Sequence, residues 1–222
     1  MKKVWRTVKP ALYVASFVLL LVAVVWLYRA NYIPHARYTG EHFGISPYIS
    51  LVDCDGDGID DQSDILQSAK DYVSTEPLYK SKYYATGYPD DGYGVCTDVV
   101  AFALKGAGYD LMELVNQDIL ENPKDYQIEK PDINIDFRRV VNLQVYFSHT
   151  ALSLTTDPEE IDQWQGGDIV VWEHHVGVIS DVRNRNGVPF VLHNGSLIQA
   201  SYEEDVLETY GKIVGHYRVN SL

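Results

Sequence analysis

The stretch GYGVCTDVVAFALKGAG, residues 92–108, holds the most informative residue of the chain, Cys96. Glycines interrupt the backbone before it, and the apolar run after it predicts a helix that begins at Thr97 and is stopped by Gly106 and Gly108. Cys96 is therefore expected where a loop turns into a helix. Because a helix start offers unpaired N–H groups and partial positive charge, this position favours the thiolate and lowers the thiol pKa.

Some neighbours of Cys96 favour catalysis by its thiol and one opposes formation of the thiolate. Gly92 and Gly94 let backbone N–H groups approach and face a developing oxyanion. Asp98 opposes thiolate formation, since a nearby acid raises a thiol pKa, but it stabilises the helix start. An inert, buried core thiol is the alternative reading of Cys96. A further alternative is a disulfide with Cys54, the one other cysteine, which would disable the nucleophile.

Two histidines lie at the ends of neighbouring expected strands, about eighty residues or more after the cysteine. His175 opens HVGVISD and could take the thiol proton as a general base. His193 ends VLHN and could hold the His175 ring in the useful tautomer, a role for which Asn194 is the alternative. His174 and His175 point to opposite faces of a strand, so only one can line a site, and spacing alone does not choose. A metal hydrolase built on these histidines lacks a recognisable ligand spacing.

The segment YYATGYPDDGYGVCTDVVAFAL resembles the nucleophile segment of the NlpC-type cell-wall cysteine peptidases, part of the papain-like superfamily. The matching positions are Tyr84, Gly87, Gly92 and Cys96, although one glycine stands where a pair is usual. HVGVISD resembles the histidine strand of these enzymes, which selects His175, and VLHN resembles the strand with the third polar residue, which selects His193. The resemblance also places Tyr84 beside the nucleophile.

Residues from about 57 to 218 are similar to an uncharacterised bacterial branch, domain-of-unknown-function family 1287. The matching stretches are DGIDDQSDIL, YPDDGYGVCTDVV, NIDFRRVVNL, WQGGDIVVW, HVGVISD and GHYR. The resemblance implies a papain-like fold in which the helix bearing Cys96 packs on an antiparallel sheet of about four to six strands. It implies catalysis without a cofactor, and it suggests a peptidoglycan-type peptide as substrate.

The pattern of the remaining chain predicts an α+β fold, because helices come first and an antiparallel sheet follows. Helices are expected at 63–74, 97–107, 110–121 and 134–149. Strands are expected at 168–172, 175–181, 188–193 and 212–218. Arg138 and Arg139, on the last expected helix, could bind a substrate carboxylate or form ordinary salt bridges.

The N-terminal region predicts a membrane anchor. Residues 11–28 carry no charge and, as a helix, would span about 27 Å, enough for a bilayer core. Residues 1–10 are basic, which predicts a cytoplasmic tail and a domain outside the cytoplasm. A cleaved signal peptide is the alternative. Residues 29–50 are expected to form a tether with some packing onto the domain, and 51–222 the papain-like domain.

The formal net charge of −13 argues against nucleic acid as a partner. Part of this charge lies in residues 53–64, whose spacing resembles a calcium loop with oxygens at positions 1, 3, 5, 7, 9 and 12. The expected ligands are Asp53, Asp55, Asp57, the Ile59 carbonyl, Asp61 and Asp64. A structural Ca²⁺ is therefore expected, and a solvated acidic turn that caps a helix is the alternative.

Together these features predict a membrane-anchored cysteine hydrolase outside the cytoplasm that cleaves amide bonds through a Cys–His–His acyl-enzyme mechanism. Two other functions fit the same residues. One is a catalytically inactive, calcium-dependent surface binding module. The other is a thiol acyltransferase of the same fold, which passes the acyl group to an amine.

Overall fold

A computed structural model describes residues 2–220, with side chains described from Tyr13 onward. The described chain divides into two compact units between His35 and Ala36. The first unit contains helix α1 (Lys2–Arg29). In the part of the chain that the structure describes, no helix has the combined length and apolar character needed to cross a bilayer. The basic side chains of the expected tail, residues 1–10, and the first two side chains of the expected anchor lie outside this part.

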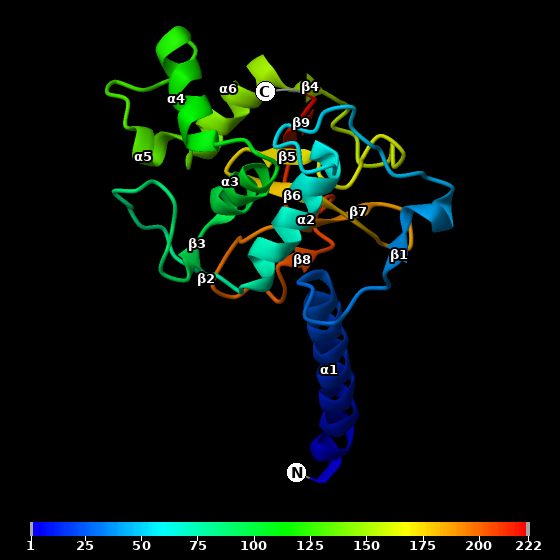
Figure 1. The fold of residues 1–222 in the computed structure, drawn as a ribbon. Coiled ribbons are helices and arrows are strands. Elements are labelled where there is room, and N and C mark those ends of the chain that lie inside the picture. The colour runs from blue at the N-terminus through cyan, green and yellow to red at the C-terminus, as the bar shows by residue number, and fades with distance from the viewer. Residues whose placement is uncertain (1, 221–222) are drawn as a thin grey trace. The chain divides into compact units, whose positions relative to one another are not determined.

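The second unit contains a mostly antiparallel sheet, and the α+β class is confirmed. Among the described residues it has seven strands, in the order β4-β9-β5-β6-β7-β8, with β1 paired to β6 (Figure 1). The strands are β1 (Tyr38–Thr39), β4 (Leu152–Ser153), β5 (Ile169–Trp172), β6 (His175–Arg183), β7 (Pro189–Leu192), β8 (Glu203–Glu204) and β9 (Ile213–Arg218). The four longer strands match the expected ones. The other three have two residues each, which is too short for a detectable alternation.

The helices of this unit precede most of the sheet in sequence. They are η1 (Gly40–Phe43), α2 (Asp61–Ser74), α3 (Cys96–Gly106), α4 (Leu111–Glu121), α5 (Ile133–Asp136) and α6 (Val140–Thr150). A separate parallel pair joins β2 (Leu78–Tyr79) to β3 (Tyr93–Gly94) just before α3. Three of the four expected helices are confirmed within a few residues.

The expected continuous helix at 134–149 is wrong, because the chain breaks between α5 and α6. Arg139 has extended backbone angles, with φ −112° and ψ 121°. The neighbouring Arg138 is buried and points away to an ion pair with Asp98 on α3. Asn142 Nδ2 donates to the Asp136 carbonyl across the break at 2.9 Å. The ion pair thus takes Arg138 out of the helical register that the sequence pattern indicated.

Helices α2 and α3 pack on each other and on β6 (Figure 1). The side chain of Asp60 caps α2 by accepting from the Ser63 N–H, and Ile65, Ala69 and Val73 form its buried face. The two helices approach closely because Gly106 has no side chain, since a Cβ there would lie 1.9 Å from Ser68 Oγ. Helix α3 is apolar almost all round, as expected of a helix buried between a second helix and a sheet.

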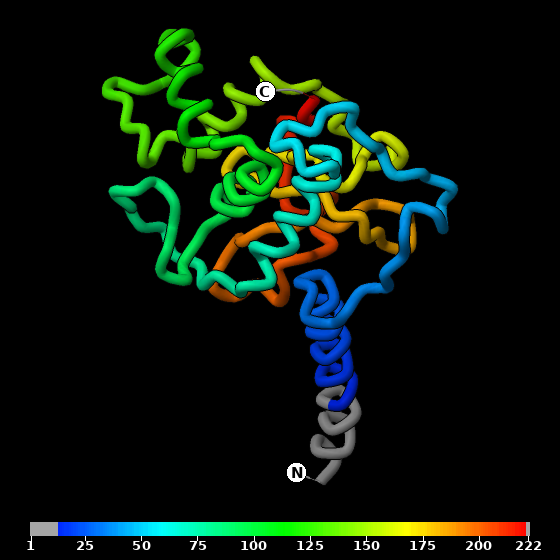
Figure 2. Tube along the Cα trace, viewed as in Figure 1, coloured from blue at the N-terminus to red at the C-terminus, as the bar shows by residue number. Residues whose placement is uncertain are grey.

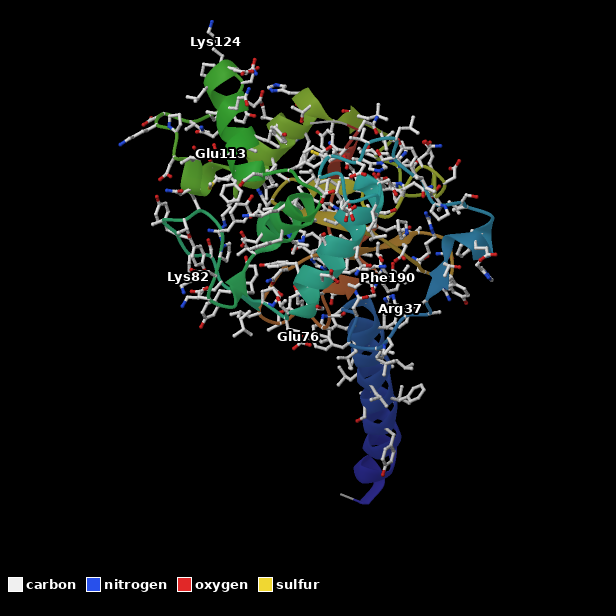
Figure 3. All side chains as sticks on the ribbon, viewed as in Figure 1. Arg37, Glu76, Lys82, Glu113, Lys124 and Phe190 are labelled. Atoms are coloured by element: carbon white, nitrogen blue, oxygen red, sulfur yellow. The ribbon has the colours of Figure 1, made fainter. Side chains whose placement is uncertain are left out.

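Both faces of the sheet are covered. In β5, Ile169 and Val171 join the core under the helices, whereas Val170 and Trp172 join a smaller cluster on the opposite face. Strand β1 pairs with the end of β6, and Arg37 directly precedes it. There the Arg37 guanidinium lies 5.0 Å from the centre of the Phe190 ring, and both residues are labelled in Figure 3. The continuous apolar runs of β5 and β7 follow from this burial on two faces.

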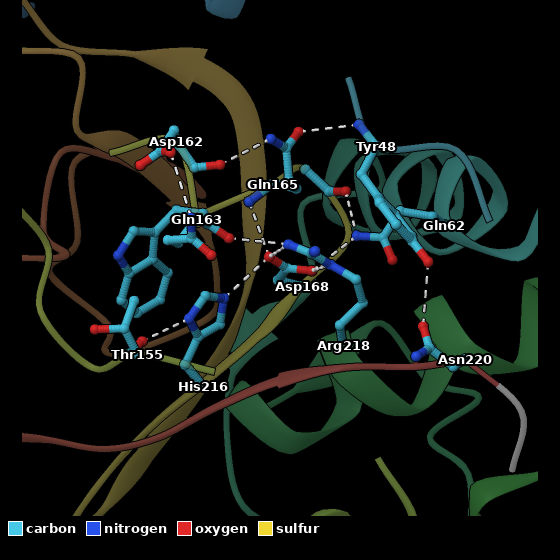
Figure 4. Close-up of polar contacts among 12 residues, drawn as sticks. Tyr48, Gln62, Thr155, Asp162, Gln163, Gln165, Asp168, His216, Arg218 and Asn220 are labelled. Atoms are coloured by element: carbon cyan, nitrogen blue, oxygen red, sulfur yellow. Dashed lines mark hydrogen bonds and ion pairs between the residues drawn. The ribbon is translucent and has the colours of Figure 1, made fainter. Parts of the chain in front are cut away.

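A buried carboxylate, Asp168, ties the start of β5 to β9 and α2 (Figure 4). Each of its two oxygens accepts only from N–H donors. The donors are Arg218 Nε and Nη2 (2.7 Å each), His216 Nε2 (2.9 Å), Gln62 Nε2 (3.0 Å) and the Gln165 backbone N–H (2.8 Å). The pair with Arg218 therefore balances the buried charge, and the other donors satisfy the remaining lone pairs.

We predict that Asp168→Asn lowers the free energy of unfolding by about 3–5 kcal/mol, because an amide NH₂ would face donors at either oxygen position and Arg218 would lose its counter-charge. Urea unfolding followed by circular dichroism measures this. Asp90→Asn, the same change at an exposed carboxylate, is the control. A loss below about 1 kcal/mol for Asp168→Asn would contradict the role assigned to this network.

Candidate active site

Cys96 is the first residue of α3, at the helix start that the sequence predicted. Asp98 anchors this start, because its Oδ2 accepts from the Val95 N–H at 2.8 Å. Arg138 holds the same carboxylate in two places, through Nε at 2.6 Å and Nη2 at 2.9 Å. Both side chains are almost fully buried, so Arg138 positions the nucleophile segment, and its guanidinium is bound to Asp98 rather than free for a substrate carboxylate.

Asn194 fixes the chain just before the cysteine. Its Nδ2 donates to the carbonyl oxygens of Pro77 (2.8 Å) and Gly94 (3.2 Å). Tyr202 adds a hydrogen bond from its hydroxyl to the Pro77 carbonyl at 2.9 Å. The loop before α3 and the loop after β7 therefore lie side by side, as Figure 2 also shows. Asn194 therefore anchors the loop before α3. The side chain that bonds His175 is His193, and not Asn194, which was the alternative for that role.

His175 and His193 are brought together across β6 and β7. His175 Nε2 lies 2.9 Å from His193 Nδ1, and both rings are buried. On its other side, His193 Nε2 lies 3.2 Å from Oε2 of Glu204 in β8, a residue that no sequence pattern had indicated. His174, by contrast, has a side chain 88% exposed in the turn between β5 and β6. The choice of His175 over His174 agrees with this geometry.

Aromatic rings hold the His175 ring in place. Tyr210 stacks on it with ring centres 4.1 Å apart and planes inclined by 19°. Trp172, its partner across β5 and β6, lies with its ring centre 5.5 Å away. Gly195 allows Tyr210 and His193 to approach, since a Cβ there would lie 3.0 Å from His193 Nδ1 and 3.1 Å from the Tyr210 hydroxyl. This aromatic contact restricts the orientation of the imidazole.

Helix α3, which begins at Cys96, packs on β6, the strand that His175 opens, and the Val176 backbone N–H favours the Cys96 thiolate. Burial nevertheless raises the pKa of the Cys96 thiol to about 11, with Asp98 adding to the rise and the Val176 and Thr97 N–H groups opposing it. The expected lowering of this pKa is therefore wrong, since desolvation outweighs the helix start. Burial, followed by repulsion from His193, lowers the pKa of His175 to about 2.

The resting site thus contains a neutral thiol and a neutral imidazole at physiological pH. Nε2 of His175 is engaged by His193, which leaves Nδ1 as the ring nitrogen that can receive a proton. Such an arrangement suits general-base catalysis, in which the thiol proton moves as the sulfur attacks. It does not require a preformed thiolate–imidazolium pair.

The supporting residues take defined places. The hydroxyl of Tyr84 donates to Asp91 Oδ1 at 2.7 Å, and the Arg138 guanidinium lies 5.1 Å from the centre of its ring. Gly94 leaves room for Tyr72, whose hydroxyl would lie 2.3 Å from a Cβ on that glycine. Cys54 and Cys96 are both free thiols, so the alternative disulfide is not formed in this structure.

The acidic loop brings Asp53, Asp55 and Asp57 together, with oxygens of all three within 4.8 Å of one another. Asp64 is buried nearby, and burial together with the charges of the loop aspartates raises its pKa to about 6. Asp61 is not turned toward the group. Its oxygens accept from the Cys54 N–H at 2.8 Å and from the Tyr109 hydroxyl. The Ile59 N–H donates to Asp57 Oδ1 at 2.8 Å, and its side chain is exposed.

Two cavities of the described surface lie apart from Cys96. One has a volume of 570 Å³ and is lined by residues that include Tyr48, Gln62 and Arg183. The other has a volume of 350 Å³ and includes Tyr202 and Glu203. Cys96 lines neither of them, and it is only partly buried.

Comparison with known proteins gives a family but no activity. Residues 66–219 match the profile described as domain of unknown function DUF1287, which confirms the family expected from the sequence. The chain is 37% identical over 167 residues to the uncharacterized protein YijF of Escherichia coli K12, covering 69% of this chain and 80% of that protein. No solved structure shows a significant match. The acidic loop lies before the matched residues.

We predict that the Cys96 thiol in the full chain ionises near pH 11, above the value of about 8.5 for a free cysteine. Burial favours the protonated thiol, so the thiolate forms only as the pH rises through this value. NMR of ¹³C-labelled cysteine in the Cys54→Ser variant follows a single thiol. A midpoint below about 7 would contradict the neutral resting site and indicate an ion pair with His175.

Proposed function

The chain belongs to the DUF1287 family, and we propose that it is a cysteine hydrolase that cleaves amide bonds in cell-wall peptides, with a papain-like, NlpC-type fold. One observation carries the proposal. A buried His175–His193 hydrogen bond of 2.9 Å lies at the start of β6, the strand on which the helix that begins at Cys96 packs. A thiol at a helix start, packed on a strand whose imidazole is oriented by a third polar group, supports nucleophilic acyl transfer.

The reaction proposed for this site has two stages. The sulfur of Cys96 attacks the amide carbonyl while His175 Nδ1 takes the thiol proton, and the resulting imidazolium then donates a proton to the leaving amine. Backbone N–H groups at the start of α3 stabilise the oxyanion. His175 next removes a proton from water, whose oxygen attacks the thioester carbonyl. The C–S bond then breaks, the acid leaves, and the imidazolium returns the proton to the sulfur of Cys96. His193 keeps the His175 ring oriented in both stages.

The substrate and location proposed here rest on the sequence. A peptidoglycan-type peptide follows from the resemblance of the nucleophile and histidine segments to NlpC-type enzymes. A position outside the cytoplasm, held by residues 11–28 as a single-pass anchor, follows from the uncharged run behind a basic N-terminus. The acidic character of the chain fits a peptide substrate and not a nucleic acid.

One observation favours a different function. A partly buried, protonated Cys96 thiol is also what an inactive member of the fold would show, so a surface binding module is the second candidate. The two candidates differ in whether any amide bond is cleaved.

We predict that the full chain cleaves purified muropeptides, that Cys96→Ala abolishes cleavage, and that His175→Ala lowers kcat by about 100- to 10,000-fold. His174→Ala is the matched control and should retain the wild-type rate, because that imidazole is exposed. Mass spectrometry of the products identifies the bond. Cleavage that survives Cys96→Ala would contradict the assigned nucleophile, and no cleavage by any form would favour the binding module. Transfer of the acyl group to an added amine in preference to water would indicate an acyltransferase.

We also propose that the acidic loop binds a structural Ca²⁺ through Asp53, Asp55 and Asp57, with Asp64 next to them. Carboxylate oxygens are the ligands that this ion prefers, and a cation would relieve the repulsion among these residues. Asp61 is left out of this set because its carboxylate is engaged elsewhere.

Calcium at 100 times its Kd should stabilise the full chain by about 2.7 kcal/mol, which raises the melting temperature by roughly 5–10 °C. The double variant Asp55→Asn, Asp57→Asn should lose this shift, because its amide oxygens keep the local backbone hydrogen bonds but not the charge. Asp90→Asn is the control. Calorimetric melting with calcium chloride and with a chelator decides, and equal melting temperatures would contradict the site.

A further inference from the structure

We infer that Glu204 is a positioning residue of the proposed site, whose carboxylate sets the tautomer of His193 and, through it, the tautomer of His175. The inference rests on the proposed function and extends the site from three residues to four. Glu204 lies in β8, opposite Val191 of β7, and is 6% exposed. It therefore reaches the site from β8, the strand next to β7, and His193 directly follows β7.

The two oxygens of Glu204 have separate tasks. Oε1 accepts from the backbone N–H groups of Ala200 (3.0 Å) and Ser201 (3.1 Å). Oε2 lies 3.2 Å from His193 Nε2. Both partners of Oε1 are backbone N–H groups, which can only donate, so Oε1 must be an acceptor. With both backbone donors on Oε1, the oxygen that faces the His193 ring is Oε2.

The charge of Glu204 determines which ring nitrogens of His193 and His175 carry protons. A carboxylate only accepts, so His193 carries its proton on Nε2 and presents a lone pair at Nδ1. His175 Nε2 must then donate to His193 Nδ1 across the 2.9 Å contact. A neutral imidazole has one N–H, so Nδ1 of His175 is left as a lone pair. This is the form that can take a proton from Cys96.

The adjacent carboxylate, Glu203, provides a matched comparison. It lies on the same short strand but faces elsewhere, where it accepts from the Ser180 hydroxyl and pairs with Arg37. Removing its charge changes β8 without touching the histidine pair. Glu203→Gln therefore controls for general effects of losing a carboxylate from this strand.

The substitution Glu204→Gln separates a positioning role from a purely structural one, because only a positioning role predicts a change in the His175 tautomer. Its amide NH₂ cannot face Ala200 and Ser201, because both positions offer N–H donors. The NH₂ group must therefore point at His193 Nε2 and donate to it, which moves the His193 proton to Nδ1. His193 then donates to His175 Nε2, and the His175 proton moves to Nδ1, where it blocks transfer from Cys96.

The test uses the full chain with Cys54→Ser, so that Cys96 is the remaining thiol. Imidazole ¹⁵N NMR should show His175 protonated at Nε2 in this parent and in Glu203→Gln, and at Nδ1 in Glu204→Gln. Alkylation of Cys96 by iodoacetamide at neutral pH should fall by about 100-fold or more in Glu204→Gln. Glu204→Ala should lose less, because water can accept from His193 and the productive tautomer stays accessible.

Two results would overturn the inference: an unchanged His175 tautomer in Glu204→Gln, or an alkylation rate for Glu204→Gln above that for Glu204→Ala. A purely structural role predicts the faster rate for Glu204→Gln, since this near-isosteric change disturbs packing less than Glu204→Ala does. The near-isosteric glutamine also keeps the test informative if the alanine variant is unstable. Failure of the peptidase proposal remains distinguishable, because it shows as absent muropeptide cleavage, whereas the NMR and alkylation results require no substrate.

Discussion

The hydrogen-bonded chain from His175 through His193 to Glu204 is the constraint on which the candidate site depends. A buried imidazole can serve as a base only if the correct nitrogen holds the lone pair, and solvent cannot set that choice inside the protein. Glu204 determines which nitrogen holds the lone pair. Two backbone N–H groups hold one of its carboxylate oxygens, and the other oxygen contacts His193. Each later link follows from the hydrogen-bonding capacity of a neutral ring.

The packing of β7 beside β6, on which the His175–His193 contact depends, requires a glycine at position 177. A Cβ at this position would lie 2.5 Å from Val191 Cγ1 and 3.1 Å from the Leu192 carbonyl oxygen. Only glycine lets β7 pass there without displacement, so the glycine in HVGV is explained by the position of His193. On the helix side, the buried Asp98–Arg138 pair fixes the start of α3 in a comparable way. Both halves of the site are thus held by tertiary contacts, and the chemistry depends on them.

This explains how far the sequence could predict the molecule. The helix start at Cys96 and the long strands could be predicted, because glycine breaks and apolar runs are local signals. The pairing of His175 with His193 followed from a resemblance. Glu204 could not be found, since a two-residue strand in a polar stretch has no periodic pattern. The rise in the Cys96 pKa was missed as well, because burial by the rest of the fold is not a local property.

His193 and Glu204 are expected to act on His175 as one unit, and a double-mutant cycle measures whether they do. Iodoacetamide alkylation of Cys96 at neutral pH would be compared in the parent chain, His193→Ala, Glu204→Ala and the double variant. If Glu204 acts only through His193, the double variant should react at the rate of His193→Ala alone. If the two losses multiply, the residues act independently, and the hydrogen-bonded chain does not control the site.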